Sequence, residues 1–195
     1  MIYVLATCIA VGLSLGGAYA YWVFLAYRFS VISKGQAYQS AQMPMNVLLE
    51  TVRQHGIRCV IDLRRDGDYI AEERETLAGV GVAYFHFPSP QVPSEETIEQ
   101  CLEIMDRPEN RPLLIHCKHG EGRSLLVAAV FRMEYEGWSN RRAWRALRVL
   151  PQMGSFAEHR RKGKFILNYV PRRYSSLGSS PRGTTPLPEP VGKTR

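Results

Sequence analysis

A nine-residue run, His116 to Ser124, constrains the fold of this chain more than any other feature of the sequence. Its letters are HCKHGEGRS; it follows the apolar run at 112–115 and precedes a segment with apolar residues at helical spacing. This order predicts a strand, a tight loop and the start of a helix. Such a loop directs successive backbone N–H groups inward at the positive end of a helix dipole, where a dianionic phosphate fits.

The two ends of this loop carry the residues with the most distinctive chemistry, Cys117 and Arg123. The field that binds a phosphate also stabilises a thiolate, and it lowers a cysteine pKa from about 8.5 to roughly 3.5–7.5. The planar guanidinium of Arg123 can bind two phosphoryl oxygens at once. Gly120 and Gly122 permit positive φ angles and close backbone approach. We therefore predict that phosphate is bound by Lys118, His119, Gly120, Glu121, Gly122 and Arg123.

The run resembles the signature of the cysteine-based protein tyrosine and dual-specificity phosphatase superfamily, which reads His-Cys, five residues, Arg, then Ser or Thr. Three further segments, at 38–42, 55–64 and 81–84, look like successive landmarks of the compact bacterial dual-specificity-like members. The resemblance covers residues 36–170. It implies a protein tyrosine phosphatase-like fold and hydrolysis of phosphate monoesters without a metal or another cofactor.

The proposed chemistry gives each end of the loop a role. Cys117 attacks phosphorus and forms a phosphocysteine, while Arg123 and the backbone N–H groups stabilise the equatorial oxygens. Ser124 can donate a hydrogen bond to the sulfur and help it leave in the second step. By the resemblance, His116 orients the loop and helps to keep Cys117 ionised. A lone cysteine is more often an inert small hydrophobe, but the neighbouring glycines, arginine and serine favour the nucleophile.

The general acid is where the sequence departs from the family pattern. The family supplies it as an Asp on a loop before the preceding helix, and residues 85–94 contain no Asp. The nearest carboxylates, Glu95 and Glu96, are our first candidates, although they also suit the start of a helix by complementing its dipole. Asp66 and Asp68 are second candidates. Glu121 is a third carboxylate, but inside the phosphate loop we expect its effect to be electrostatic. A fourth possibility is that no acid exists, which leaves a slow enzyme or a phosphate-binding pseudophosphatase.

The charges of the loop bear on the substrate. Relatives that cleave inositol phosphates line this loop with extra Lys or Arg, whereas here Glu121 partly cancels Lys118 and repels a densely anionic headgroup. A phosphotyrosine or dual-specificity phosphoprotein substrate is therefore favoured over a phospholipid headgroup. A rhodanese-type sulfurtransferase also places Cys in a loop after a strand, but His116 and the Arg-Ser ending argue against it. Two roles remain open for Asp62, Arg64 and Arg65: these residues support the loop, or they form a simple ion pair at the end of a strand.

The N-terminal segment indicates a membrane. Residues 2–27 contain no charged side chain and are long enough to span a bilayer, and Arg28 follows. Tyr21, Trp22 and Tyr27 suit an interfacial belt. We predict a single-pass anchor over 1–28 and a lipid bilayer as a partner. A cleaved signal peptide, ending at Ala18-Tyr19-Ala20, is the alternative; it lacks a basic residue before the apolar run.

The side of the membrane follows from the flanking charges. Arg28 and Lys34 come after the anchor, so the positive-inside rule favours a cytoplasmic catalytic domain. Some relatives in the family are exported, which favours the other side. The four cysteines show no metal-binding spacing and no disulfide framework, which is typical of a reducing compartment.

The rest of the chain divides into a linker, a domain and a tail. We expect a linker at 29–35, a phosphatase domain at 36–170 and a disordered tail at 171–195, which carries five basic residues and one acidic residue. The formal net charge is +7, but no aromatic-basic module supports nucleic-acid binding.

Strands alternate with helices through the domain, which predicts an α/β fold with a mostly parallel central sheet flanked by helices. Strands are expected at 37–40, at an edge, and at 57–63, 82–87 and 111–116. Helices are expected at 46–55, 70–78, 95–105 with Ser94 as N-cap, 124–136, 140–150 and 156–169. The phosphate loop then lies at the carboxyl end of a central strand, where such sheets bind ligands.

Overall fold

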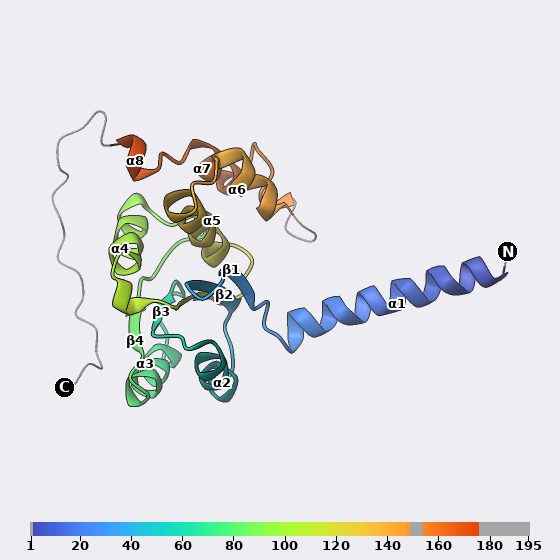
Figure 1. The fold of residues 1–195 in the computed structure, drawn as a ribbon, viewed down its shortest axis with the longest axis horizontal. Coiled ribbons are helices and arrows are strands. Elements are labelled where there is room, and N and C mark those ends of the chain that lie inside the picture. Colours follow the sequence, from blue (N-terminus) through green and yellow to red (C-terminus); the bar gives the residue numbers. More distant parts are fainter. Residues whose placement is uncertain (1, 149–153, 176–195) are drawn as a thin grey trace.

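The computed structural model describes residues 2–148 and 154–175. Their centre is a five-stranded sheet in the order β1-β2-β5-β3-β4 (Figure 1). Four strands run parallel, and β1 pairs antiparallel with β2. The strands are β1 Ser30–Ser33, β2 Ala37–Ala41, β3 Cys59–Asp62, β4 Ala83–His86 and β5 Leu113–Cys117. The predicted α/β class with a mostly parallel sheet is confirmed.

Helices cover both faces of this sheet (Figure 1). On one face α2 (Met45–His55) and α3 (Tyr69–Gly79) pack over a core that includes Leu48 and Leu77. On the other face, α5 (Arg123–Tyr135) lies at the centre of a larger core. It contacts α4 (Glu95–Met105), α6 (Asn140–Leu147) and α7 (Arg161–Asn168), and the 3-10 helix η1 (Pro108–Asn110) contacts α4.

The central strand β5 explains why the phosphate loop lies where it does. All five of its residues are buried, as expected for a parallel strand covered on both faces. Leu114 faces the core under α2 and α3, whereas Leu113, Ile115 and Cys117 face the core under α5. This alternation places the cysteine on the face of the sheet that α5 covers.

Two helix ends confirm the local predictions. Gly56 ends α2 in the left-handed conformation, with φ of 60°. Ser94 begins α4, and its hydroxyl accepts a hydrogen bond of 3.2 Å from the backbone N–H of Thr97.

Two predictions about secondary structure are wrong. The expected linker at 29–35 contains β1, so β2 is an inner strand and the sheet edge lies one strand further out. The helix expected from residue 156 begins only at Arg161. A Cβ on Gly163 would lie 2.2 Å from the carbonyl oxygen of Ala157, because the preceding turn folds back against the helix. Over 156–160 the backbone forms turns and a bend instead of a helix.

The domain extends beyond its predicted end at residue 170. Helix α8 spans Arg172–Ser175, and the guanidinium of Arg172 pairs with Asp106 at 2.6 Å and with Glu134 at 3.5 Å. The first residues of the expected disordered tail are therefore docked on the domain. The rest of that tail, 176–195, and the last two residues of the helix expected at 140–150 lie outside the described residues.

Helix α1 (Ile2–Phe24) projects away from the sheet and its helices (Figure 1). Its segment Tyr3–Phe24 is long and apolar enough to cross a membrane, a property that signal sequences near an N-terminus share. Tyr27 and Arg28, both with positive φ, connect α1 to β1.

Candidate active site

Cys117 is the last residue of β5, and Arg123 is the first residue of α5. Five residues, 118–122, connect them. The Cys117 sulfur lies 3.3 Å from the hydroxyl oxygen of Ser124. Burial alone would raise the pKa of the Cys117 thiol, but hydrogen bonds from the Ser124 hydroxyl and from the backbone N–H groups of Ser124 and Gly120, together with the charge of Arg123, lower it below its usual value. The geometry around the sulfur thus favours the thiolate form.

The Ser124 hydroxyl is itself held by β2. The side-chain amide of Gln39 donates hydrogen bonds of 3.2 Å to the Ser124 hydroxyl and 3.2 Å to the carbonyl oxygen of Gly120. Because Ser124 accepts from Gln39, its own proton is available for the Cys117 sulfur or for the carbonyl of Ser40, 3.5 Å away. Sequence reasoning missed Gln39, although it lies within the landmark segment 38–42.

The two glycines of the loop differ, because the backbone surrounds Gly120 whereas a flexible side chain lies beside Gly122. Gly120 has φ of 64°, and a Cβ there would lie 2.7 Å from the backbone nitrogen of Ala41. Gly122 has φ of −143°, so the expected positive φ is absent at this position. A Cβ on Gly122 would instead lie 2.8 Å from the ammonium nitrogen of Lys162.

The guanidinium of Arg123 is oriented by two backbone carbonyls. It donates hydrogen bonds of 2.5 Å to Leu63, just after β3, and 3.2 Å to Ser89, in the loop after β4. These bonds hold the arginine beside the catalytic pocket, where its remaining N–H groups can face a phosphate. The pocket is lined by Arg65, Ser89, Gln91, Lys162 and the loop residues Cys117, Lys118, His119, Glu121, Gly122 and Arg123.

A buried network of charges supports the loop from below. The ring nitrogen Nε2 of His116 lies 2.9 Å from Glu73 and 3.7 Å from Asp62. Arg64 binds the same two carboxylates at 2.7 Å from Asp62 and 2.5 Å from Glu73, and Tyr84 donates to Asp62 at 2.6 Å. The sequence left open whether Asp62 and Arg64 support the loop or form an ion pair. In the structure they form an ion pair, and Asp62 also lies close to His116, directly before the loop.

The charges of this network balance when His116 is protonated. Burial would lower the pKa of His116, but the carboxylates of Asp62 and Glu73 raise it above its usual value. Burial would raise the pKa of Asp62, but His116 and Arg64 lower it to about 2. Asp62, Glu73 and His116 lie close enough to hold a metal ion, but the guanidinium of Arg64 already binds both carboxylates. The arrangement is therefore an ion-pair network. Nothing in the sequence around Glu73 indicated its part in it.

Lys162, on α7, is a second residue that sequence reasoning missed. Its ammonium lies over the loop beside Gly122 and lines the catalytic pocket. Among the described residues it makes no hydrogen bond or ion pair. Burial lowers the pKa of Lys162, while Cys117 and Glu121 act in the opposite direction. Lys162 therefore adds a positive charge to the pocket in which a phosphate ester would lie.

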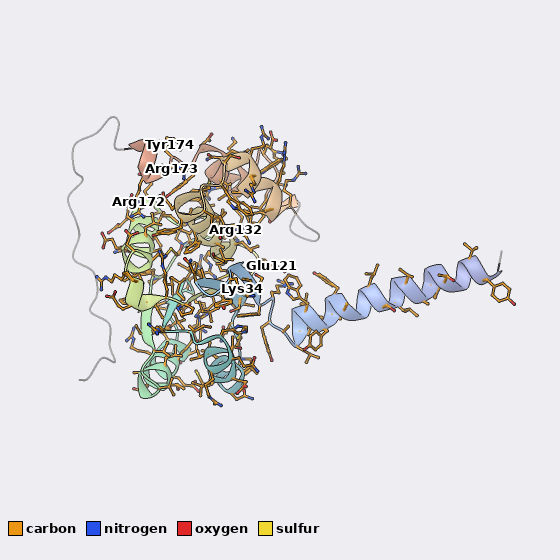
Figure 2. All side chains as sticks on the ribbon, viewed as in Figure 1. Lys34, Glu121, Arg132, Arg172, Arg173 and Tyr174 are labelled. Atoms are coloured by element: carbon orange, nitrogen blue, oxygen red, sulfur yellow. The ribbon has the colours of Figure 1, made fainter. Side chains whose placement is uncertain are left out.

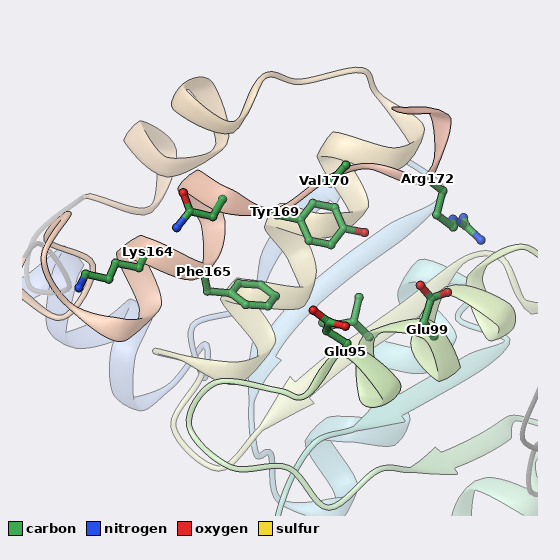
Figure 3. Close-up of a pocket in the computed structure, with 9 residues that line it drawn as sticks. Glu95, Glu99, Lys164, Phe165, Tyr169, Val170 and Arg172 are labelled. Carbon is green, nitrogen blue, oxygen red and sulfur yellow. The ribbon is translucent and has the colours of Figure 1, made fainter. Parts of the chain in front are cut away.

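The candidate general acids lie elsewhere. Glu95, with Glu99, lines a different pocket between α4 and α7, opposite Phe165 and Tyr169 (Figure 3). Neither Glu95 nor Glu96 lines the catalytic pocket as described above. Asp66 is exposed and lies 3.8 Å from His86, and Asp68 precedes α3. Of the described residues that line the catalytic pocket, Glu121 alone carries a carboxylate, and it forms an ion pair with Arg28.

A thiolate at the end of a strand, an arginine at the start of a helix and inward N–H groups between them define a cysteine-dependent phosphatase. A family model described as "DSP-PTPase phosphatase fused to NAD+ Kinase" matches residues 38–160, more than half of the chain. The chain therefore belongs to this family, within the cysteine-based dual-specificity phosphatase superfamily.

Solved structures show the same fold. TpbA from P. aeruginosa is 22% identical, with 74% of this chain and 86% of that chain covered and a TM-score of 0.56. A TpbA variant has also been solved in complex with pTyr. The core catalytic domain of the PP-IP phosphatase SIW14 from S. cerevisiae is 20% identical, with 76% and 89% covered and a TM-score of 0.62. The PTP-2 phosphatase of Cydia pomonella is 16% identical, with 74% and 94% covered and a TM-score of 0.57. No curated protein matches the chain.

Proposed function

We propose that this phosphatase acts on phosphate monoesters with phenolic leaving groups, and on phosphotyrosine in proteins in particular. The observation that carries this preference is the lining of the catalytic pocket, where the only carboxylate among the described residues is engaged by Arg28. General acid catalysis is typically worth about 10² to 10⁴-fold. A phenolate leaves with less help from an acid than the alkoxide of serine or threonine does.

The reaction runs in two steps. The Cys117 thiolate attacks phosphorus as the bond to the phenolic oxygen breaks, and the equatorial oxygens face Arg123 and the loop N–H groups. Water then attacks phosphorus as the P–S bond breaks, and both protons of the water stay on the released phosphate. The Ser124 hydroxyl, 3.3 Å from the sulfur, stabilises the departing thiolate. In this scheme Cys117 is the only residue whose charge changes.

A specific observation favours a second candidate, a small polyphosphorylated substrate or a phospholipid headgroup. The sequence suggested that Glu121 cancels Lys118, but in the structure Arg28 compensates Glu121 and Lys162 adds a further cation. A densely anionic substrate would then be attracted. A leaving group that is itself a phosphate also needs no acid, and SIW14, which shares the fold, is described as a PP-IP phosphatase.

One substrate panel separates these candidates. Full-length protein in detergent is assayed on a phosphotyrosine peptide, the matched phosphoserine peptide, an inositol pyrophosphate and a phosphoinositide. We expect the highest kcat/KM on phosphotyrosine, and a smaller loss of it in Lys162→Met than on the two inositol substrates. A higher kcat/KM on either inositol substrate, with a steep loss in Lys162→Met, would instead establish the polyanionic substrate. Binding of a phosphopeptide without hydrolysis of any substrate in the panel would establish that the protein is a pseudophosphatase.

We also propose that α1 anchors the protein in a membrane with the catalytic domain on the cytoplasmic side. Its support is the length and apolar character of Tyr3–Phe24 and the positive charges that follow. The protein should stay in membranes through a carbonate wash and keep Met1. A mature N-terminus at Tyr21 in a soluble exported fraction would contradict the proposal.

A further inference from the structure

The outer side of the phosphate loop contacts the segment that follows α1. Because the loop N–H groups face inward, its carbonyl groups face away from the phosphate. The carbonyl oxygen of His119 accepts a hydrogen bond of 2.8 Å from a guanidinium nitrogen of Arg28. The same nitrogen pairs with the carboxylate of Glu121. Figure 2 shows Glu121 on the side of the domain from which α1 leaves.

Arg28 is held in place by a constrained turn. Tyr27 and Arg28 have φ of 49° and 53°, in the left-handed region that non-glycine residues rarely adopt. The carbonyl oxygen of Tyr27 accepts a hydrogen bond of 2.8 Å from the backbone nitrogen of Ala41, at the end of β2. Gly120 of the phosphate loop packs against that same nitrogen. The turn, the end of β2 and the loop therefore form one contact region, and left-handed backbone of this kind is often found where function requires it.

The contact differs from an ordinary surface ion pair. The Arg28 side chain is only 12% exposed, whereas that of Glu121 is 42% exposed. A partly desolvated guanidinium that binds both a carboxylate and a carbonyl fixes the backbone of the loop as well as its charge. An exposed pair would contribute little.

Two consequences for catalysis follow from these contacts. Glu121 lines the same pocket as Cys117, so without Arg28 its negative charge would oppose both the thiolate and a dianionic phosphate. The His119 carbonyl would also lose the partner that holds it outward, and the N–H groups of the neighbouring peptides would no longer be fixed in the direction of the phosphate.

We propose that Arg28 is a positioning residue for the catalytic loop, so that the segment directly after the apolar helix is part of the phosphatase machinery. It holds the His119 carbonyl outward and compensates Glu121. The inference deepens the proposed function, because the loop it positions is the one that carries Cys117.

The test uses full-length protein in detergent and the variants Arg28→Ala, Arg28→Gln, Glu121→Gln and the double variant Arg28→Ala/Glu121→Gln. Arg53→Ala is the matched control, since Arg53 is an exposed arginine that pairs with Glu50 on α2. Two quantities are measured: kcat/KM on an aryl phosphate, and the pH dependence of Cys117 alkylation by iodoacetamide, followed by mass spectrometry of the Cys117 peptide. The second reports on the loop even where turnover is absent.

We expect Arg28→Ala to lower kcat/KM roughly tenfold to a hundredfold, a typical cost of a misplaced catalytic group. Its Cys117 alkylation curve should move to higher pH, while Arg53→Ala matches the wild type in both measurements. Adding Glu121→Gln should recover part of the loss, since the uncompensated charge is then removed. The loss in kcat/KM that remains in the double variant measures the contribution of the hydrogen bond from Arg28 to the His119 carbonyl.

Several results would overturn the proposal. Wild-type kcat/KM and alkylation in both Arg28→Ala and Arg28→Gln would show that the contact does not position the loop. Full recovery in the double variant would show that Arg28 acts through charge alone. If Arg28→Ala does not fold, Arg28→Gln decides, because its amide keeps a donor for His119 without the charge. If the wild type fails to turn over the aryl phosphate, the proposed function fails, and the alkylation curves still decide the role of Arg28.

Discussion

The phosphate loop is supported on two sides by regions of different kinds. Below it, His116 contacts a network of Asp62, Glu73 and Arg64 that is almost fully buried. Outside it, Arg28 reaches His119 and Glu121 at the surface. The buried network lies within residues 38–160, which match the family model, whereas Arg28 lies before them.

This difference indicates a division of roles. A buried network of full charges is costly to break, because each remaining partner is left without compensation in a low dielectric. A partly exposed contact is screened by water and contributes less to folding. We therefore expect the inner region to determine stability and the outer region to modulate the reaction. The predictions below on Glu73, Asp62 and His116 test the inner region, and the prediction on Arg28 tests the outer one.

The largest expected effect comes from Glu73→Gln. The substitution removes one of two carboxylates that balance Arg64 and His116, and leaves a net positive charge among buried groups. Loss of one partner of a buried pair typically costs about 3–5 kcal/mol. Urea denaturation should show a loss of this order in the free energy of unfolding. A loss below about 1 kcal/mol, the size of a surface pair, would contradict the distinction between the two regions.

The next prediction concerns acid stability. The pKa of Asp62 is lowered to about 2 in the folded protein, against roughly 3.9 when unfolded. Its ionised form therefore contributes stability that is present above about pH 3.9 and is lost as the pH falls towards 2, by about 2 kcal/mol. The difference in unfolding free energy between wild type and Asp62→Asn should shrink over this window. A constant difference would indicate an unperturbed carboxyl.

The stabilising effect of the same network also has an upper pH limit, which His116 sets. Its folded pKa is raised above 6.5, so its charged form contributes stability below pH 6.5, and this contribution is lost as the pH rises through the folded pKa. The network should therefore stabilise the fold most between about pH 4 and 6.5.

The smallest expected effect on stability comes from the outer region. Arg28→Ala should lower the free energy of unfolding by about 1 kcal/mol, the upper end of the range for exposed pairs, because Arg28 is largely buried but Glu121 is open to water. The kcat/KM of Arg28→Ala is expected to fall by much more than this small loss of stability explains. Equal urea midpoints for Arg28→Ala and Glu73→Gln would show that the two regions do not differ in the way we describe.

Much of the fold could be predicted from local patterns. The buried run of β5, the glycine after α2 and the serine before α4 each act through neighbouring residues, so the chain itself carries the signal. Strand β1 was missed because its four residues, SVIS, become a strand only by pairing with β2. The helix expected from residue 156 was too long because a turn packs against Gly163.

The candidate site could be predicted only where it is contiguous. Residues 116–124 lie in one run, and the sequence pattern placed them together. Gln39, Glu73, Lys162 and Arg28 reach the loop from β2, α3, α7 and the segment after α1, and no local pattern marks such distant contacts. Glu95 illustrates the converse, because it is near the expected position in the sequence but lines a different pocket.

The central claim is that Cys117 carries the phosphoryl group between the two steps. The most direct test is to mix full-length protein with an aryl phosphate, stop the reaction with acid before the first turnover is complete, and map the phosphoryl group by mass spectrometry. We expect one phosphoryl group on the Cys117 peptide, and none in Cys117→Ser, which should bind the ester without hydrolysing it. Phosphate on another residue, or turnover by Cys117→Ser at the wild-type rate, would contradict the account.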